Sequence, residues 1–213
     1  FEEPWLDEGV NTFWENRIVD HCYGNGYGIM SFPFVRCSDE DFTRLQYVPE
    51  KSRSAATNDL WSWNYPHDTY GMMSYAKTAL WLHTLQGLIG EETMNHVFRE
   101  YYRRWAFRHP SGKDFIAVVN DMVKQDLGNK YGPDMNWFFD EVLYGSGICD
   151  YGVSGISVRE ISGFKGMVTE GDSVKIKKPD KGADTLKRST VMLERYGEVT
   201  LPVDVLIHFD NGD

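Results

Sequence analysis

The periodicity of the sequence changes at Gly145-Ser146-Gly147. Before this point, apolar residues recur at the spacing of amphipathic helices; after it, they alternate or are β-branched between Gly and Asp turns. A sequence with the helical period does not form a stable strand, and a sequence with the strand period does not form a stable helix. The chain is therefore predicted to be mainly α with a C-terminal all-β part, with a helical domain over residues 1–147 and a partial antiparallel β-sandwich over 148–213.

Helix-start signals divide the first part into separate helices. Ser38 with Asp41 and Ser111 with Asp114 have the spacing of capping boxes. The expected helices span residues 4–22, 71–89, 91–107 and 114–127, and a further helix begins at Pro133. The short connections between them indicate an α-helical bundle or array.

The strand pattern after the glycines is shorter and less regular. Alternating or β-branched segments predict strands at 152–161, 172–178, 189–197 and 198–210. About four strands are few for a complete sandwich. We therefore expect only part of a β-domain.

The charge of the chain argues against a nucleic-acid partner. Its formal net charge is −10, and nearly all of the excess negative charge lies in residues 1–150. Binding to phosphate needs a basic surface, and the basic pair Arg103-Arg104 is short. We expect no nucleic acid among the partners.

Cysteine and hydropathy patterns say little about the compartment. Cys22, Cys37 and Cys149 form no C-x-x-C pair, so buried or free thiols are favoured over a bridge, which weakly favours a reducing, cytoplasmic setting. No apolar run reaches the ~20 residues of a membrane span. Membrane association of a longer protein stays open.

Several residues could carry chemistry, but each has a simpler structural explanation. Glu8 and Glu15 are seven residues apart with Thr12 between them, so a helix would place them on one face; such a pair is more often solvated than catalytic. Tyr75 and Lys77 begin an apolar helix, where a tyrosine usually belongs to the core. The histidines show no H-x-H or H-x-x-x-H pair, so the residues alone give no local metal motif.

Four segments nevertheless resemble one family in the right order. The segment PWLDEGVNTFWE is similar to the W-L-x-E-G motif of the M1 family of zinc aminopeptidases, which are gluzincin metallopeptidases. YAKTALWLHTLQGLIGEETM resembles the family's Y-x-K-G-A stretch and following helix, and FRHPSGKDFIAVV and WFFDEVLYGSG resemble its later segments. The resemblance covers roughly residues 4–147. It implies that this part is the α-helical half of a thermolysin-like catalytic domain.

The resemblance assigns roles to residues. It implies that Glu8 is a zinc ligand, that Glu15 orients a zinc-binding histidine, and that the Tyr75 hydroxyl donates to the oxyanion of a tetrahedral intermediate. Asp7, Thr12 and Lys77 are possible neighbours of the site. Asp7 stands where asparagine is common, and Thr78 replaces the usual glycine after the lysine, which could alter the packing beside Tyr75.

The family's metal-binding and exopeptidase motifs are not in this sequence. H-E-x-x-H and G-x-M-E-N are missing from the 213 residues, and we expect them to precede Phe1. The resemblance implies zinc-dependent hydrolysis of peptides by removal of N-terminal residues. This chain alone is expected to be inactive and to bind no zinc, because a catalytic site needs three protein ligands.

Two other interpretations stay open. The chain could belong to a non-catalytic M1-like interaction or scaffold module, since fold alone does not guarantee chemistry. It could also be an unrelated helical domain, in which Glu8 and Tyr75 would lie far apart. The expected partners are a peptide substrate and the upstream H-E-x-x-H segment of the same protein. We also expect the chain to self-associate through an exposed apolar face that includes Phe13 or Trp14.

Overall fold

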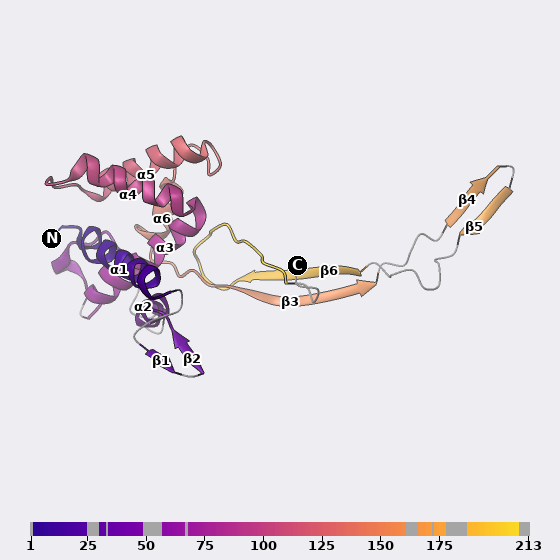
Figure 1. Ribbon diagram of the computed structural model, residues 1–213, viewed down its shortest axis with the longest axis horizontal. Coiled ribbons are helices and arrows are strands. Elements are labelled where there is room, and N and C mark those ends of the chain that lie inside the picture. Colours follow the sequence, from indigo (N-terminus) through magenta and orange to yellow (C-terminus); the bar gives the residue numbers. More distant parts are fainter. Residues whose placement is uncertain are drawn as a thin grey trace. The chain divides into compact units, whose positions relative to one another are not determined.

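The structure is a computed structural model of the 213-residue chain (Figure 1). It describes residues 2–24, 30–32, 34–48, 57–66, 68–160, 166–171, 173–177 and 187–208. The chain forms two compact units, Phe1–Ile148 with Val199–Asp213, and Cys149–Glu198. The predicted division into domains 1–147 and 148–213 stays a prediction. We describe each unit by itself.

The first unit is almost entirely helical, as predicted. Two strands, β1 (Met30–Phe32) and β2 (Val35–Cys37), pair antiparallel beside the helices. The helical elements are η1 (Pro4–Leu6), α1 (Glu8–Tyr23), α2 (Asp39–Tyr47), η3 (Ser62–Asn64), η4 (Met72–Lys77), α3 (Thr78–Ile89), α4 (Glu91–Trp105), α5 (Gly112–Leu127) and α6 (Asn136–Val142).

Both predicted capping boxes are confirmed. At the start of α2, the Asp41 amide donates to Ser38 Oγ over 3.0 Å, and the Ser38 amide donates back to Asp41 Oδ2 over 3.1 Å. Ser111 and Asp114 repeat this arrangement at α5. Two of the amides that a helix start leaves without partners are satisfied at each site.

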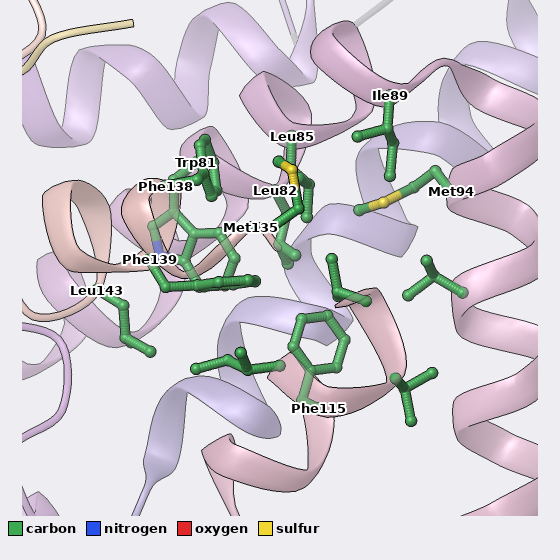
Figure 2. Packing of buried hydrophobic residues seen from close by; sticks show 14 of the residues in the cluster. Trp81, Leu82, Leu85, Ile89, Met94, Phe115, Met135, Phe138, Phe139 and Leu143 are labelled. Atoms are coloured by element: carbon green, nitrogen blue, oxygen red, sulfur yellow. The ribbon is translucent and has the colours of Figure 1, made fainter. Parts of the chain in front are cut away.

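The core of the helical unit is rich in aromatic side chains. Trp5 of η1 is fully buried, with its ring centroid 5.4 Å from Trp81 of α3 and 5.7 Å from Phe115 of α5. Figure 2 shows Trp81, Phe115 and Phe139 of α6 within the same cluster. Each such buried side chain contributes about 1.5–3 kcal/mol. The core therefore fixes the short segment that leads into α1.

The predicted apolar face of α1 is only partly exposed. Phe13 is fully buried, because its ring lies 4.7 Å from His83 and 5.6 Å from Phe98 between centroids. Trp14 is partly buried, and Ile18 is 57% exposed. An exposed apolar face would thus contain Trp14 but not Phe13. Self-association stays a prediction.

The second unit consists of two antiparallel strand pairs. In the chain, β4 (Gly166–Glu170) and β5 (Ser173–Lys177) lie between β3 (Tyr151–Glu160) and β6 (Lys187–Arg195), and β3 pairs with β6 while β4 pairs with β5 (Figure 1). The β3–β6 register shifts between Val153 and Gly155, as at a β-bulge. The C-terminal β part is confirmed, and its described strands form these two antiparallel pairs.

The strand predicted over 198–210 is wrong for its described residues. Residues 198–208 form no strand. Val199 instead belongs to the helical unit, where its amide donates to the Ile148 carbonyl over 3.2 Å and its side chain is buried. Pro202 then lacks the amide that a central strand needs. Alternation of apolar residues alone did not distinguish this segment from a strand.

Two smaller expectations concern the whole chain. All three cysteines are free, and Cys22 and Cys149 are exposed. Among the described helices, none combines the length and the apolar character that a membrane span requires.

Candidate functional site

Glu8 lies at the first turn of α1, next to two tyrosines. The buried Trp5 fixes the preceding turn, and the Asp7 amide donates to the Pro4 carbonyl over 3.1 Å. The Glu8 carboxylate is half-buried, and its Oε1 accepts a hydrogen bond from the Tyr70 hydroxyl at 3.1 Å. Tyr75 lies near the same carboxylate, because its ring centroid is 6.4 Å from that of Tyr70 and Glu8 raises its pKa. The structure therefore brings Glu8 and Tyr75 together.

Tyr75 lies in a π-helix that begins two residues after Tyr70. In an α-helix, side chains five residues apart point about 140° away from each other. Tyr75 lies in η4, whose π-helical i→i+5 hydrogen bonds bring such residues closer to one face. The Tyr70 and Tyr75 ring centroids are 6.4 Å apart. The single helix predicted over 71–89 is thus a π-helix followed by α3, which turns Tyr75 away from the core and leaves it 38% exposed.

The Glu8 carboxylate makes both tyrosines harder to deprotonate. The nearby Glu8 carboxylate, followed by burial, raises the pKa of Tyr75 to about 12. Burial, followed by the hydrogen bond with Glu8, raises the pKa of Tyr70. A negative charge beside a phenol disfavours the phenolate. Both hydroxyls are therefore hydrogen-bond donors near neutral pH.

Gly9 allows α1 to approach the π-helix closely. A Cβ at Gly9 would lie 2.1 Å from Thr78 Cγ2, 2.2 Å from Thr78 Cβ and 2.6 Å from the Ser74 carbonyl oxygen. No side chain fits at such distances. The glycine of the W-L-D-E-G segment thus sets the spacing that places Glu8 within reach of Tyr75.

Thr78 is part of a buried polar network beneath Tyr75. Its hydroxyl accepts a hydrogen bond from Asn58 Nδ2 at 2.6 Å and donates to the Met73 carbonyl at 3.2 Å. Asn58 Nδ2 also donates to Met73, over 2.9 Å, and both polar side chains are fully buried. Thr78 therefore helps to hold the π-helix that carries Tyr75.

A cavity of about 580 Å³ adjoins Tyr75. Thr12 and Glu15 of α1 line it together with Tyr75, and α2 contributes Asp39 and Gln46. Glu15 is exposed at this cavity, and the Thr12 hydroxyl donates to the Glu8 carbonyl over 2.9 Å. Thr12 and Glu15 of the predicted helix face thus line this hollow, whereas Glu8 is not among its lining residues. The roles of Glu15 and Thr12 stay predictions.

The other two predicted neighbours differ from each other. Asp7 is exposed, accepts a hydrogen bond from Asn11 at 2.9 Å, and its charge helps to raise the pKa of Tyr75. Lys77 is buried, and its ammonium donates to the Gly145 carbonyl over 3.1 Å. Burial lowers the pKa of Lys77 to about 8. This contact holds the turn after α6, and the place of Lys77 beside the site stays a prediction.

Among the described residues, no three His, Cys, Asp or Glu side chains form a group that could hold a metal ion. Glu8 offers carboxylate oxygens, which are suitable ligands for zinc, and Tyr70 already orients one of them. The donor set therefore fits one ligand of a metal site, with further ligands needed from elsewhere.

The sequence reasoning missed Tyr70 and Asn58. Tyr70 precedes Tyr75 by five residues, a spacing that points to a shared face only if a π-helix is expected. Asn58 lies in a segment without periodicity, and its contact with Thr78 depends on the tertiary fold. No local signal marked either residue.

Comparison with known proteins places these residues in a family context. The model of the Peptidase family M1 domain matches residues 1–147. Leucine aminopeptidase 2 of Emericella nidulans is 24% identical over 159 residues, which cover 70% of this chain and 24% of that protein. The Leukotriene A-4 hydrolase homolog of Botryotinia fuckeliana is 25% identical over 149 residues, which cover 70% of this chain and 22% of that protein.

The chain thus spans about a quarter of the length of the curated relatives it matches. No solved structure matches it. The family match nevertheless includes the whole Glu8–Tyr75 region and extends to the turn after α6. On this basis the chain belongs to peptidase family M1, a family of zinc-dependent metallopeptidases.

Proposed function

We propose that the protein to which this chain belongs is a zinc-dependent aminopeptidase, with Glu8 as one metal ligand and Tyr75 as a catalytic hydrogen-bond donor. The observation that carries the proposal is that Glu8 and Tyr75, which are far apart in the sequence, meet at Tyr70, whose hydroxyl donates to Glu8 over 3.1 Å and whose ring centroid lies 6.4 Å from that of Tyr75. An unrelated helical domain gives no reason for this contact. Removal of N-terminal residues is proposed because several relatives are named leucine aminopeptidase.

Zinc would be held by Glu8 together with ligands from an H-E-x-x-H segment outside these 213 residues. Bound zinc would supply Lewis-acid polarisation of a carbonyl group and would lower the pKa of a bound water. Glu15 would support a zinc-binding histidine from its place on the same face of α1. Tyr70 would hold the orientation of the Glu8 carboxylate through its hydrogen bond.

Tyr75 would act on the substrate from the wall of the cavity. Its hydroxyl is protonated near neutral pH and partly exposed, so it can donate to a peptide carbonyl oxygen. Negative charge develops on that oxygen during attack by water, and a preorganised donor stabilises it more than the neutral carbonyl.

The test compares tyrosine variants of the protein expressed from its full coding sequence. Tyr75→Phe should lower kcat by about 10²–10³ and leave the zinc content unchanged, because one oxyanion donor is worth roughly that much. Tyr70→Phe should act mainly on zinc affinity, by about 10–100-fold, because it removes a hydrogen bond to the metal ligand. Tyr23→Phe, at an exposed position at the end of α1, serves as the control.

Near-normal turnover of Tyr75→Phe would rule out its catalytic role. Absence of any peptidase activity in the wild-type protein, together with absence of H-E-x-x-H from the full coding sequence, would favour the non-catalytic M1-like module instead. We further propose that the 213-residue chain alone is inactive. Stoichiometric, tight zinc binding by this chain in a titration would contradict that proposal.

A further inference from the structure

A second hollow lies on the helical unit, between α1 and the C-terminal half of α4. Its volume is about 710 Å³, within the range of small-molecule sites. Its walls are mainly aromatic and come from Trp14, Phe98, Tyr101, Tyr102 and Trp105. None of its lining residues belongs to the cavity beside Tyr75. We call it the α1–α4 groove.

Arg99 and Arg108 of the α1–α4 groove differ from Arg103 and Arg104 of α4 in their ion pairing. Arg103 and Arg104 both bind Glu100 over 2.7 Å, and Arg104 also binds Asp121. Arg99 and Arg108 line the groove, and within the described part of the chain their guanidinium groups have no carboxylate partner. In an otherwise acidic chain, the groove therefore presents cationic groups beside apolar walls.

The turn after α4 holds one of these arginines at the groove. Phe107 has a φ of 61°, a left-handed conformation that is uncommon for a bulky residue, and its side chain is fully exposed. The next amide, that of Arg108, donates to the Trp105 carbonyl over 2.9 Å. Such strain persists where the surrounding structure imposes it and is frequent at ligand sites. The turn keeps Arg108 next to Trp105 and Pro110, which both line the groove.

We propose that the α1–α4 groove binds a small amphipathic organic anion. The aromatic walls would take its apolar body, and Arg99 and Arg108 would bind its carboxylate or sulfonate group. A neutral ligand would gain only the apolar contacts, and a cationic one would be repelled. The proposal does not depend on zinc or on peptidase activity.

The experiment uses a matched pair of fluorescent probes, dansylglycine and its uncharged amide, dansylglycinamide, titrated with the 213-residue chain. Dansylglycine should bind roughly tenfold or more tightly than the amide, because a hydrogen bond to a charged group adds to the shared aromatic contacts. Added salt should reduce the difference. Arg99→Gln with Arg108→Gln should abolish it, whereas Arg103→Gln, which changes an arginine already paired with Glu100, should leave it intact.

Equal affinities of the two probes, or a preference that survives Arg99→Gln with Arg108→Gln, would overturn the proposal. Failure of both probes to bind would overturn it as well. Sedimentation velocity on the same samples tests whether a second copy of the chain fills the groove instead. A wild-type dimer that becomes a monomer in the double variant, together with no probe binding, would assign the groove to a second copy. Far-UV circular dichroism of each variant confirms that its helices are intact.

Discussion

Replacing Gly9 with alanine should separate α1 from the π-helix. The added Cβ would lie 2.1 Å from Thr78 Cγ2, whereas ordinary carbon contacts are about 3.5–4.0 Å. Thr78 is fully buried, and its hydroxyl is held by Asn58 and the Met73 carbonyl, so the side chain cannot turn aside without loss of these bonds. The Ser74 carbonyl oxygen, at 2.6 Å, is backbone. The helix α1 itself must move by more than about 1 Å.

The expected cost exceeds that of an ordinary overpacking change. Insertion of a methyl group into a packed core costs about 1–3 kcal/mol, and three contacts this close place Gly9→Ala at about 3 kcal/mol or above. Alanine favours a helix over glycine by only about 0.5–1 kcal/mol, which offsets a small part. Because Glu8 is the adjacent residue, the same shift should weaken its hydrogen bond to Tyr70 and move it away from Tyr75.

Urea unfolding followed by tryptophan fluorescence measures this cost. All seven tryptophans lie in the first 148 residues, so the signal reports on the helical unit. Gly87→Ala in α3 is the matched control, because a Cβ there meets nothing within 4 Å, and it should stabilise by about 0.5–1 kcal/mol. If Gly9→Ala unfolds within about 0.5 kcal/mol of the wild type, the close approach of α1 to the π-helix is refuted.

Three further changes probe the supporting structure. Burial, followed by the charge of Arg17, lowers the pKa of His83 from 6.5 to about 4, so as pH falls the unfolded chain takes up a proton before the folded chain does. The free energy of unfolding should therefore fall by up to about 3 kcal/mol as pH drops from 6.5 to 4. In urea titrations at each pH, His83→Gln should show a smaller dependence on pH. Glu3→Gln removes the negative charge of the carboxylate that accepts from the Gly112 amide at 2.8 Å. It should lower the free energy of unfolding in urea by about 0.5–1 kcal/mol at low salt, and at high salt the variant should be as stable as the wild type. Asn58→Ala removes buried hydrogen bonds to Met73 and Thr78 and should lower the free energy of unfolding by about 1–3 kcal/mol. An unchanged urea midpoint would contradict a stabilising role of this network.

Local patterns predicted the helices well because their signals are contained in short segments. Ser38 and Ser111 begin their helices as expected, since a capping box needs only residues three apart. The π-helix at Tyr75 was missed because apolar residues continue on all sides of the segment. Periodicity therefore placed Tyr75 in the core, whereas it is 38% exposed.

The candidate site could not be assembled from local patterns. Glu8 meets Tyr75 through the close packing at Gly9, and a contact between distant segments leaves no periodic trace. Only the ordered resemblance to the M1 family linked the two residues. Tyr70, which the resemblance did not assign, emerged from the structure alone. In residues 198–208, the alternation of apolar residues predicted a strand, but the segment forms none, and Val199 contacts the helical unit instead.

The zinc content of the protein expressed from its full coding sequence tests the central claim most directly. The wild type should hold one zinc per chain after dialysis, as catalytic sites of this chemistry do. Glu8→Gln should reduce zinc affinity by more than about 100-fold, because loss of a direct ligand exceeds the 10–100-fold effect of an outer hydrogen bond. Glu92→Gln, at an exposed position on α4, should retain the metal. Stoichiometric zinc in purified Glu8→Gln would contradict the assignment of Glu8 as a ligand.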